Sequence, residues 1–188
     1  MIPNNQITSA PLFAPYTVLP SATYNPTKQV VYGGINLNDS SQGRVVIKWV
    51  VQYRQNVIQI LKDGSSVVEW SYAVPGVSSV SLAFDQNMAP TVGFQIGTTS
   101  YMRYYSGVDS SYINRTVSGT TSCQVALDNA NVTYDAFSDI IFAYTRNNGL
   151  YYTYQRDNYI TERYAGPTTK KLYRVGLNAS NRLQFGLG

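Results

Sequence analysis

Two stretches of the chain repeat one another, and this repetition constrains the fold more than any other feature. Each copy holds several short apolar blocks separated by turn-forming residues. The matching blocks are 82–85 and 125–128, 91–94 and 141–144, 100–104 and 150–154, and 112–113 and 159–160. Four short antiparallel strands in each repeat form the pattern of a β-propeller blade. We further predict a more diverged copy at 35–72 and half a copy at 171–187.

The clearest hairpin signal lies in residues 138–165, where two runs rich in Ile, Phe and Tyr flank an Asn-Gly pair. Asn-Gly tolerates the positive φ angles of a tight turn. With Asn148-Gly149 as the loop, we expect Tyr144 opposite Thr153 and Ala143 opposite Tyr154. One face of this hairpin then carries Ile140, Phe142, Tyr144 and Tyr151, and the other carries Ile141, Ala143, Tyr152 and Tyr154. Both faces are apolar or amphipathic, which predicts a sheet covered on both sides.

The sequence therefore predicts an all-β protein of antiparallel four-stranded, blade-like repeats, in a β-propeller-like or sandwich arrangement. No stretch shows a helical apolar period. Three and a half repeats are fewer than the four to eight blades of closed propellers. Repeats that cannot bury both faces alone need neighbours, so the alternatives are a compact sandwich or a ring completed by several chains. We expect a homo-oligomer.

Residues 1–30 differ from the rest and are predicted to form an extended N-terminal arm before a repeat domain at 31–188. Five of the eight prolines lie here, with apolar side chains between them. Proline disfavours helix and central strand. Such an arm packs in a groove of its own chain or of a neighbour. The expected interface residues are Leu12, Phe13, Tyr16 and Leu19 of the arm and Tyr151, Tyr152 and Tyr154 of the hairpin.

The composition argues against several classes of site. There is no histidine and Cys123 is the only cysteine, so a zinc site and an intramolecular disulfide are excluded, and no cofactor is expected. Cys123 is predicted to be a small buried apolar residue, and the absence of a disulfide fits synthesis in a reducing compartment. The N-terminus lacks the features of a signal peptide, and no segment is long and apolar enough for membrane insertion.

The net charge of +4 comes with basic residues gathered in the last third of the chain: Arg156, Arg163, Lys170, Lys171, Arg174 and Arg182. A basic patch can meet nucleic acid or an acidic partner. No nucleic-acid-binding motif accompanies these residues, so we interpret them as a solvated surface and expect no nucleic-acid partner.

Other polar and aromatic residues allow two interpretations each. Asp85 and Asp128 occupy equivalent repeat positions and are an acid–base pair or, as we favour, acceptors for turn amides. Asn36, Asn38 and Asp39 are calcium ligands or turn residues; the calcium-loop pattern is absent, which favours a turn. The pairs Tyr104-Tyr105 and Tyr151-Tyr152, with Trp49 and Trp70, are sugar-stacking platforms or packing residues, and we favour packing.

Three blocks carry a resemblance to a known family: 80–94 (VSLAFDQNMAPTVGF), 138–166 (SDIIFAYTRNNGLYYTYQRDNYITERYAG) and 182–188 (RLQFGLG). Over residues 35–188 the chain resembles small virion proteins of short-tailed bacteriophages (podoviruses). The resemblance implies a non-enzymatic structural component in the virion, at the tail or tail–fibre junction. Its partners would be other phage tail or virion proteins.

An alternative is a host-receptor or glycan-binding module of the tail that recognises a bacterial surface glycan. The blades are also similar to those of sialidase-type propellers. However, the Ser-x-Asp-x-Gly-x-Thr-Trp box of those enzymes is missing from this sequence, which weakens an enzymatic interpretation.

Overall fold

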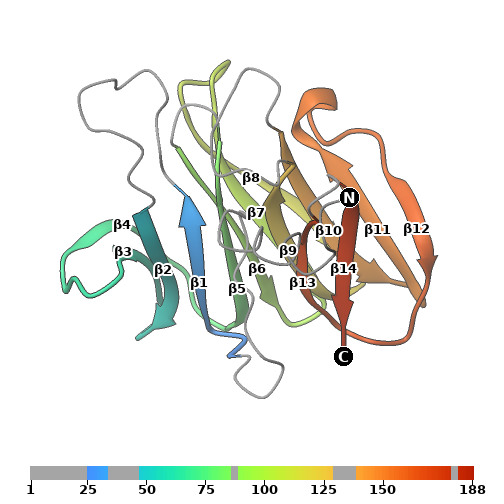
Figure 1. Ribbon diagram of the computed structural model, residues 1–188, viewed down its shortest axis with the longest axis horizontal. Helices are drawn as coiled ribbons and strands as arrows, with labels where there is room; N and C mark the ends of the chain where they lie inside the picture. Colours follow the sequence, from blue (N-terminus) through green and yellow to red (C-terminus); the bar gives the residue numbers. More distant parts are fainter. Residues whose placement is uncertain (1–24, 34–46, 86–88, 129–138, 179–181) are drawn as a thin grey trace, which may run out of the picture.

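The computed structural model describes residues 25–33, 47–85, 89–128, 139–178 and 182–188. These residues form four antiparallel sheets, each a meander of consecutive strands (Figure 1). The first sheet contains β1 (Lys28–Gly33), β2 (Ile47–Arg54), β3 (Val57–Lys62) and β4 (Val68–Ala73). The second contains β5 (Val77–Phe84), β6 (Pro90–Ile96), β7 (Thr99–Ser106) and β8 (Ser111–Ser118).

The third sheet contains β9 (Thr120–Leu127), β10 (Ile140–Arg146), β11 (Gly149–Tyr154) and β12 (Arg163–Pro167), with a short 3₁₀ helix, Gln155–Asp157, between the last two. The fourth has two strands within the described residues, β13 (Leu172–Leu177) and β14 (Leu183–Leu187). The predicted all-β class with four-stranded, blade-like repeats is confirmed.

The sheets stack in chain order, with the first strand of each beside the first strand of the next (β1, β5, β9, β13). A repeated hydrogen bond joins these strands. The backbone N–H of Leu82 donates to Gln29 Oε1 at 2.8 Å, and that of Val125 donates to Ser81 Oγ at 3.0 Å. The N–H of Leu172 donates to Ser122 Oγ at 2.7 Å. A polar side chain on each first strand thus pairs a backbone donor of the following sheet.

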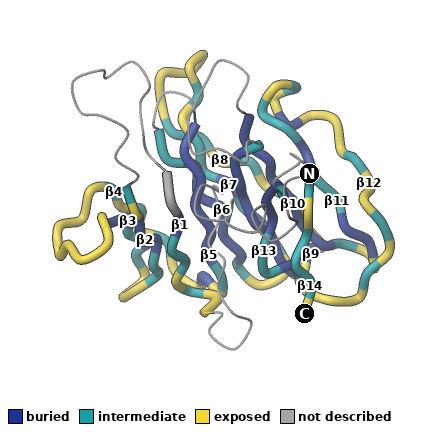
Figure 2. Tube along the Cα trace, in the orientation of Figure 1, coloured by how far each residue is buried: buried dark blue, intermediate teal, exposed yellow. Residues whose placement is uncertain are grey.

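The core lies between the sheets rather than inside any one of them (Figure 2). Strand β10 is buried on both sides. Its residues Ile140, Phe142 and Tyr144 join the large cluster shared with the first two sheets. Its residues Ile141 and Ala143 join a second cluster formed with β13 and β14. The prediction that both faces of this hairpin are covered is therefore confirmed.

The predicted pairing in the same hairpin is wrong by two residues. Tyr144 lies opposite Tyr151, and Ala143 lies opposite Tyr152. The loop residues are Asn147 and Asn148, with φ values of 51° and 57°. Because the error is an even number of residues, every side chain keeps its predicted face.

Gly149 is instead the first residue of β11, and a glycine is needed there for packing rather than for the turn. A Cβ there would lie 2.8 Å from the Tyr151 ring and 2.9 Å from the Tyr164 ring. The glycine therefore makes room for two aromatic rings, while the turn itself uses two asparagines, which tolerate left-handed φ.

Two further details of the repeat differ from prediction. Tyr112 and Ile113 lie in β8, whereas Tyr159 and Ile160 lie in the connection before β12, so this pair of blocks is not equivalent.

The first sheet begins at Lys28 rather than at residue 35, so the end of the segment predicted as an arm belongs to this sheet. Residues 28–30 are part of β1, and the Pro26 carbonyl accepts a hydrogen bond from Val80 N–H at 2.7 Å. Residues 1–24 lie outside the described residues.

Cys123 lies in β9 and is buried, as predicted. Burial raises the pKa of its thiol to about 12, so the reactive thiolate is scarce at ordinary pH. We expect iodoacetamide at pH 8.5 to leave the folded protein unlabelled and to modify it fully in 6 M guanidinium chloride. Mass spectrometry gives the extent of labelling. Rapid modification of the native protein would contradict this burial.

Candidate functional site

The three hairpin tyrosines predicted at an interface are half-buried and contact neighbours in their own chain. The Tyr151 ring packs against Tyr144 and Tyr164. Tyr152 packs against Tyr154 and Phe185. Two guanidinium groups lie near the centre of the Tyr154 ring, those of Arg156 at 4.5 Å and Arg163 at 5.0 Å. The arm residues of the same prediction, Leu12, Phe13, Tyr16 and Leu19, lie outside the described residues, as do Asn36, Asn38 and Asp39.

Asp85 directly follows β5 and stabilises the turn to β6, as the turn interpretation predicts. Its carboxylate accepts a hydrogen bond from Ala89 N–H at 2.8 Å, and its own N–H donates to the Ala89 carbonyl at 3.0 Å. Asn178 ends β13 in the same manner, with equivalent bonds to Arg182 of 3.0 Å each. Asn178 was not predicted to occupy a position equivalent to those of Asp85 and Asp128, although 82–85 (LAFD), 125–128 (VALD) and 175–178 (VGLN) share one sequence pattern.

Asp128 ends β9 but has a different partner. Its carboxylate lies 2.5 Å from a terminal nitrogen of Arg156, whose Nε donates to Asp139. One guanidinium thus bridges two carboxylates across the ends of β9 and β10. Glu162 accepts hydrogen bonds from Tyr144 and from Arg146, the latter at 2.7 Å. Asp85 and Asp128, the two carboxylates considered as an acid–base pair, thus have structural partners, as do Asp139 and Glu162. No group of three metal-binding side chains occurs within the described ranges.

Tyr159 is buried between the second and third sheets, with its ring against Tyr104 at 5.1 Å. Its hydroxyl has no hydrogen-bond partner among the residues that the structure describes. Burial raises the pKa of Tyr159 well above its ordinary value, so the phenol stays neutral. By contrast, the buried Tyr144 hydroxyl donates to Glu162.

These two tyrosines give a matched pair of substitutions. Tyr159→Phe removes a buried hydroxyl without a partner and should leave the free energy of unfolding unchanged or raise it by up to about 1 kcal/mol. Tyr144→Phe removes a charge-assisted hydrogen bond and should lower it by about 1–2 kcal/mol. Urea denaturation followed by circular dichroism measures both. Equal losses in the two variants would show that Tyr159 has a polar partner after all.

The connection between the third and fourth strands carries an exposed aliphatic residue in each four-stranded sheet. Val67 precedes β4 and is 62% exposed, Val108 precedes β8 and is 96% exposed, and Ile160 precedes β12 and is 74% exposed. Single exposed aliphatic residues are ordinary. Their recurrence in the same loop of three sheets defines a series, which we call the outer-loop residues. The loops reach the outside of the molecule (Figure 2).

A pocket of about 380 Å³ lies where the beginnings of the four first strands converge. Pro26 comes just before β1, Ser79 lies in β5, Thr121 lies in β9, and Lys171 and Tyr173 lie at the start of β13. Gln95 also lines the pocket, and its buried side chain donates to the Gly97 carbonyl at 2.9 Å and accepts from Ser100 at 2.6 Å. The pocket is thus built on a fixed polar network.

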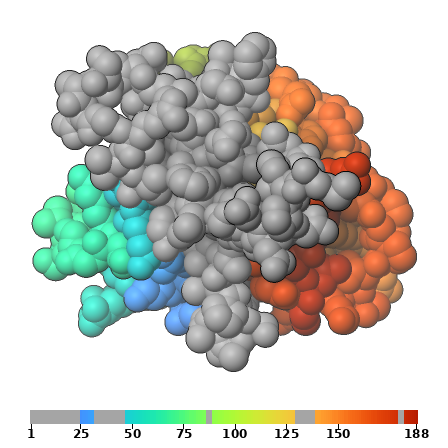
Figure 3. All heavy atoms as spheres, in the orientation of Figure 1, coloured from blue at the N-terminus to red at the C-terminus, as the bar shows by residue number. Residues whose placement is uncertain are grey.

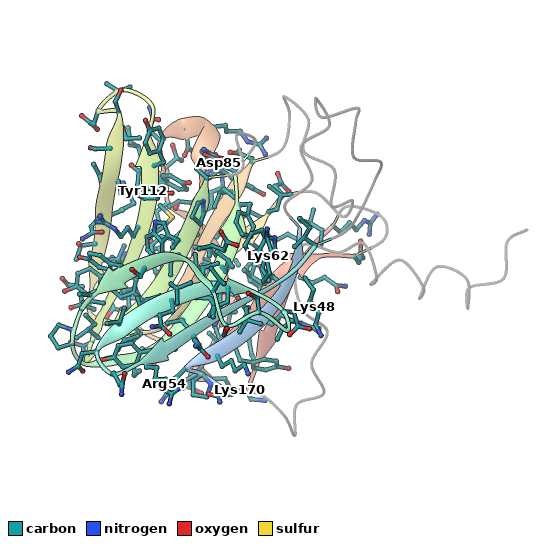
Figure 4. The ribbon with its side chains drawn as sticks, turned by 90° about the vertical axis from the view of Figure 1, so that its left-hand side faces the viewer. Lys48, Arg54, Lys62, Asp85, Tyr112 and Lys170 are labelled. Atoms are coloured by element: carbon teal, nitrogen blue, oxygen red, sulfur yellow. The ribbon has the colours of Figure 1, made fainter. Side chains whose placement is uncertain are left out.

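A second hollow, of about 400 Å³, lies on the face of the first sheet that points away from the second. Val50, Leu61 and Val68 line it together with polar and basic residues that include Lys28, Arg54 and Lys62. Figure 4 views this side of the molecule and labels Lys48, Arg54 and Lys62 on the sheet. In Figure 3 the first sheet and the β11–β12 region lie at opposite sides of the molecule.

Within the described residues, no helix has the length and apolar character needed to cross a bilayer. Comparison with family models, with curated proteins and with solved structures gives no match in any of the three.

Proposed function

We propose that this chain is a non-enzymatic structural protein of a bacteriophage virion, in the tail or at the tail–fibre junction, where several copies assemble with each other and with neighbouring virion proteins. The observation that carries the proposal is the outer-loop series Val67, Val108 and Ile160. An exposed apolar residue in the same loop of each four-stranded sheet suits contact with partners that are themselves repeated around an axis. The resemblance of blocks 80–94 and 138–166 to virion proteins is the reason for proposing a bacteriophage virion as the assembly.

The first sheet supports the same proposal. Its face that points away from the second sheet presents the hollow lined by Val50, Leu61 and Val68. Apolar side chains beside basic groups in such a hollow suit contact with a neighbouring chain.

The outer-loop residues can be tested directly. The triple variant Val67→Ser, Val108→Ser, Ile160→Ser should fold with an unchanged circular dichroism spectrum, because the three side chains are exposed. Its self-association, measured by sedimentation velocity, should weaken by at least about tenfold, since each lost apolar contact contributes roughly 0.5–1 kcal/mol. The matched control is Val67→Ile, Val108→Ile, Ile160→Val, which keeps an aliphatic group at each site. Equal association of both variants would refute the assignment.

The virion assignment needs its own experiment. Mass spectrometry of purified particles of the phage that encodes the chain should detect its peptides at a fixed ratio to the major capsid protein. The absence of these peptides from infectious particles would refute the proposal.

A further inference from the structure

We infer that the pocket at the convergence of the first strands binds an acidic monosaccharide unit, that is, a sugar ring carrying a carboxylate. The inference concerns a ligand site and stands apart from the assembly surfaces proposed above. Three lining groups carry it: the Tyr173 ring, the Lys171 ammonium and the Ser79 hydroxyl. The volume of about 380 Å³ is in the range of small-molecule sites.

Tyr173 provides a fixed aromatic surface. Its ring packs close to Gly186 of β14 and to Gly188: a Cβ at Gly186 would be 2.9 Å from the ring, and one at Gly188 would be 3.3 Å away. A ring packed closely against the chain keeps little rotational freedom before any ligand arrives, which lowers the cost of binding. The apolar face of a sugar ring packs on such a surface.

Lys171 and Ser79 supply polar groups that the fold does not use. Within the described part of the chain, neither the ammonium of Lys171 nor the hydroxyl of Ser79 has a hydrogen-bond or ion-pair partner. The neighbouring hydroxyl of Thr121 is bonded to Thr145 at 2.7 Å, and that of Ser122 accepts from Leu172 N–H. The pocket therefore offers one cation and one uncommitted hydroxyl beside an aromatic ring. This set matches a ligand with a carboxylate, hydroxyl groups and an apolar face.

The satisfied amides and hydroxyls in the lining fit the same chemistry. Gln95 is buried, and its amide nitrogen is bonded to the carbonyls of Gly97 and Thr120. It cannot turn toward a ligand without breaking these bonds. Specific recognition is thus left to Lys171 and Ser79, and the carboxylate of the ligand is the group that Lys171 selects.

The test uses the full-length protein and two ligands that differ at one carbon, methyl glucuronide and methyl glucoside. Titration followed by ¹H–¹⁵N NMR should show glucuronide binding in the millimolar range, with shifts at the Ser79, Thr121 and Tyr173 amides. The neutral glucoside should bind about tenfold more weakly, because it lacks the charge-assisted hydrogen bond to Lys171.

Two variants locate the site, and a neighbouring lysine serves as the control. Lys171→Gln should remove the preference for the glucuronide, and Tyr173→Leu should abolish binding of both ligands. Lys170→Gln changes the adjacent lysine, which does not line the pocket, and should bind like the unmodified protein. Thermal unfolding of each variant confirms that it is folded.

Three results would overturn the inference. The first is no shift of the pocket amides by either ligand, and the second is an unchanged preference in Lys171→Gln. The third is sugar binding that appears only after residues 2–24 are removed, since the pocket would then be the binding site of the chain's own N-terminal segment.

Discussion

Alanine at Phe142 should lower the free energy of unfolding by about 3–5 kcal/mol, and alanine at the adjacent Ile141 by about 2–4 kcal/mol. The two residues are neighbours on β10 with opposite side-chain directions, and both are fully buried. Phe142 packs toward the second sheet, with its ring 5.3 Å from that of Tyr144, and Ile141 packs toward β13 and β14. Large losses at consecutive strand positions are a signature of a sheet covered on both sides.

Guanidinium denaturation of the purified variants gives both values. A suitable control is Thr116→Ala in the edge strand β8, where the residue is exposed and a change within about 0.5 kcal/mol is expected. If Ile141→Ala cost no more than this control, the fourth sheet would not cover that face of β10 in solution.

Gly93→Ala should lower the free energy of unfolding by about 2–3 kcal/mol through overpacking. A Cβ at this position of β6 would lie 2.6 Å from Ser81 Oγ and 3.1 Å from Val125 Cγ1. The serine can rotate away, but its oxygen accepts the hydrogen bond from Val125 N–H. Relief of one contact therefore leaves a buried backbone donor without its partner.

The matched control for this substitution is Gly107→Ala. Gly107 is exposed in the turn between β7 and β8, and a Cβ there meets nothing within 4 Å. It should be neutral or raise stability by up to about 1 kcal/mol through the unfolded state. Differential scanning calorimetry of the two variants measures the contrast, and similar melting temperatures would refute the close packing of the second and third sheets at Gly93.

The repeat and the strand positions could be predicted because they depend on local chemistry. Turn residues such as Asn148 and Asp85 separate runs of Ile, Val and Tyr, and both signals are visible in the sequence. The pairing in the key hairpin could not be fixed, because Asn147-Asn148 and Asn148-Gly149 are both good turn pairs. The packing of two tyrosine rings on Gly149 decided between them, and that packing is tertiary.

The candidate sites depended even more on tertiary structure. Ser79, Thr121 and Lys171 are far apart in the sequence and meet only because successive first strands lie side by side. The exposure of Val67, Val108 and Ile160 could not be predicted from the sequence either, since each is an ordinary aliphatic residue near a turn. Tyr159 was placed in a strand by its likeness to Tyr112, yet it fills a gap between two sheets. By contrast, Asn178 could have been found from the pattern it shares with Asp85.

Gln29, Ser81 and Ser122 each accept a hydrogen bond from a backbone N–H of the following sheet, so these bonds all have the same direction along the chain. In each, the acceptor is synthesised before its donor. A polypeptide emerging from the ribosome can therefore complete one sheet and use it as a template for the next, so that folding keeps pace with translation. Swapping the order of two repeats would break this succession while leaving the composition of every sheet intact.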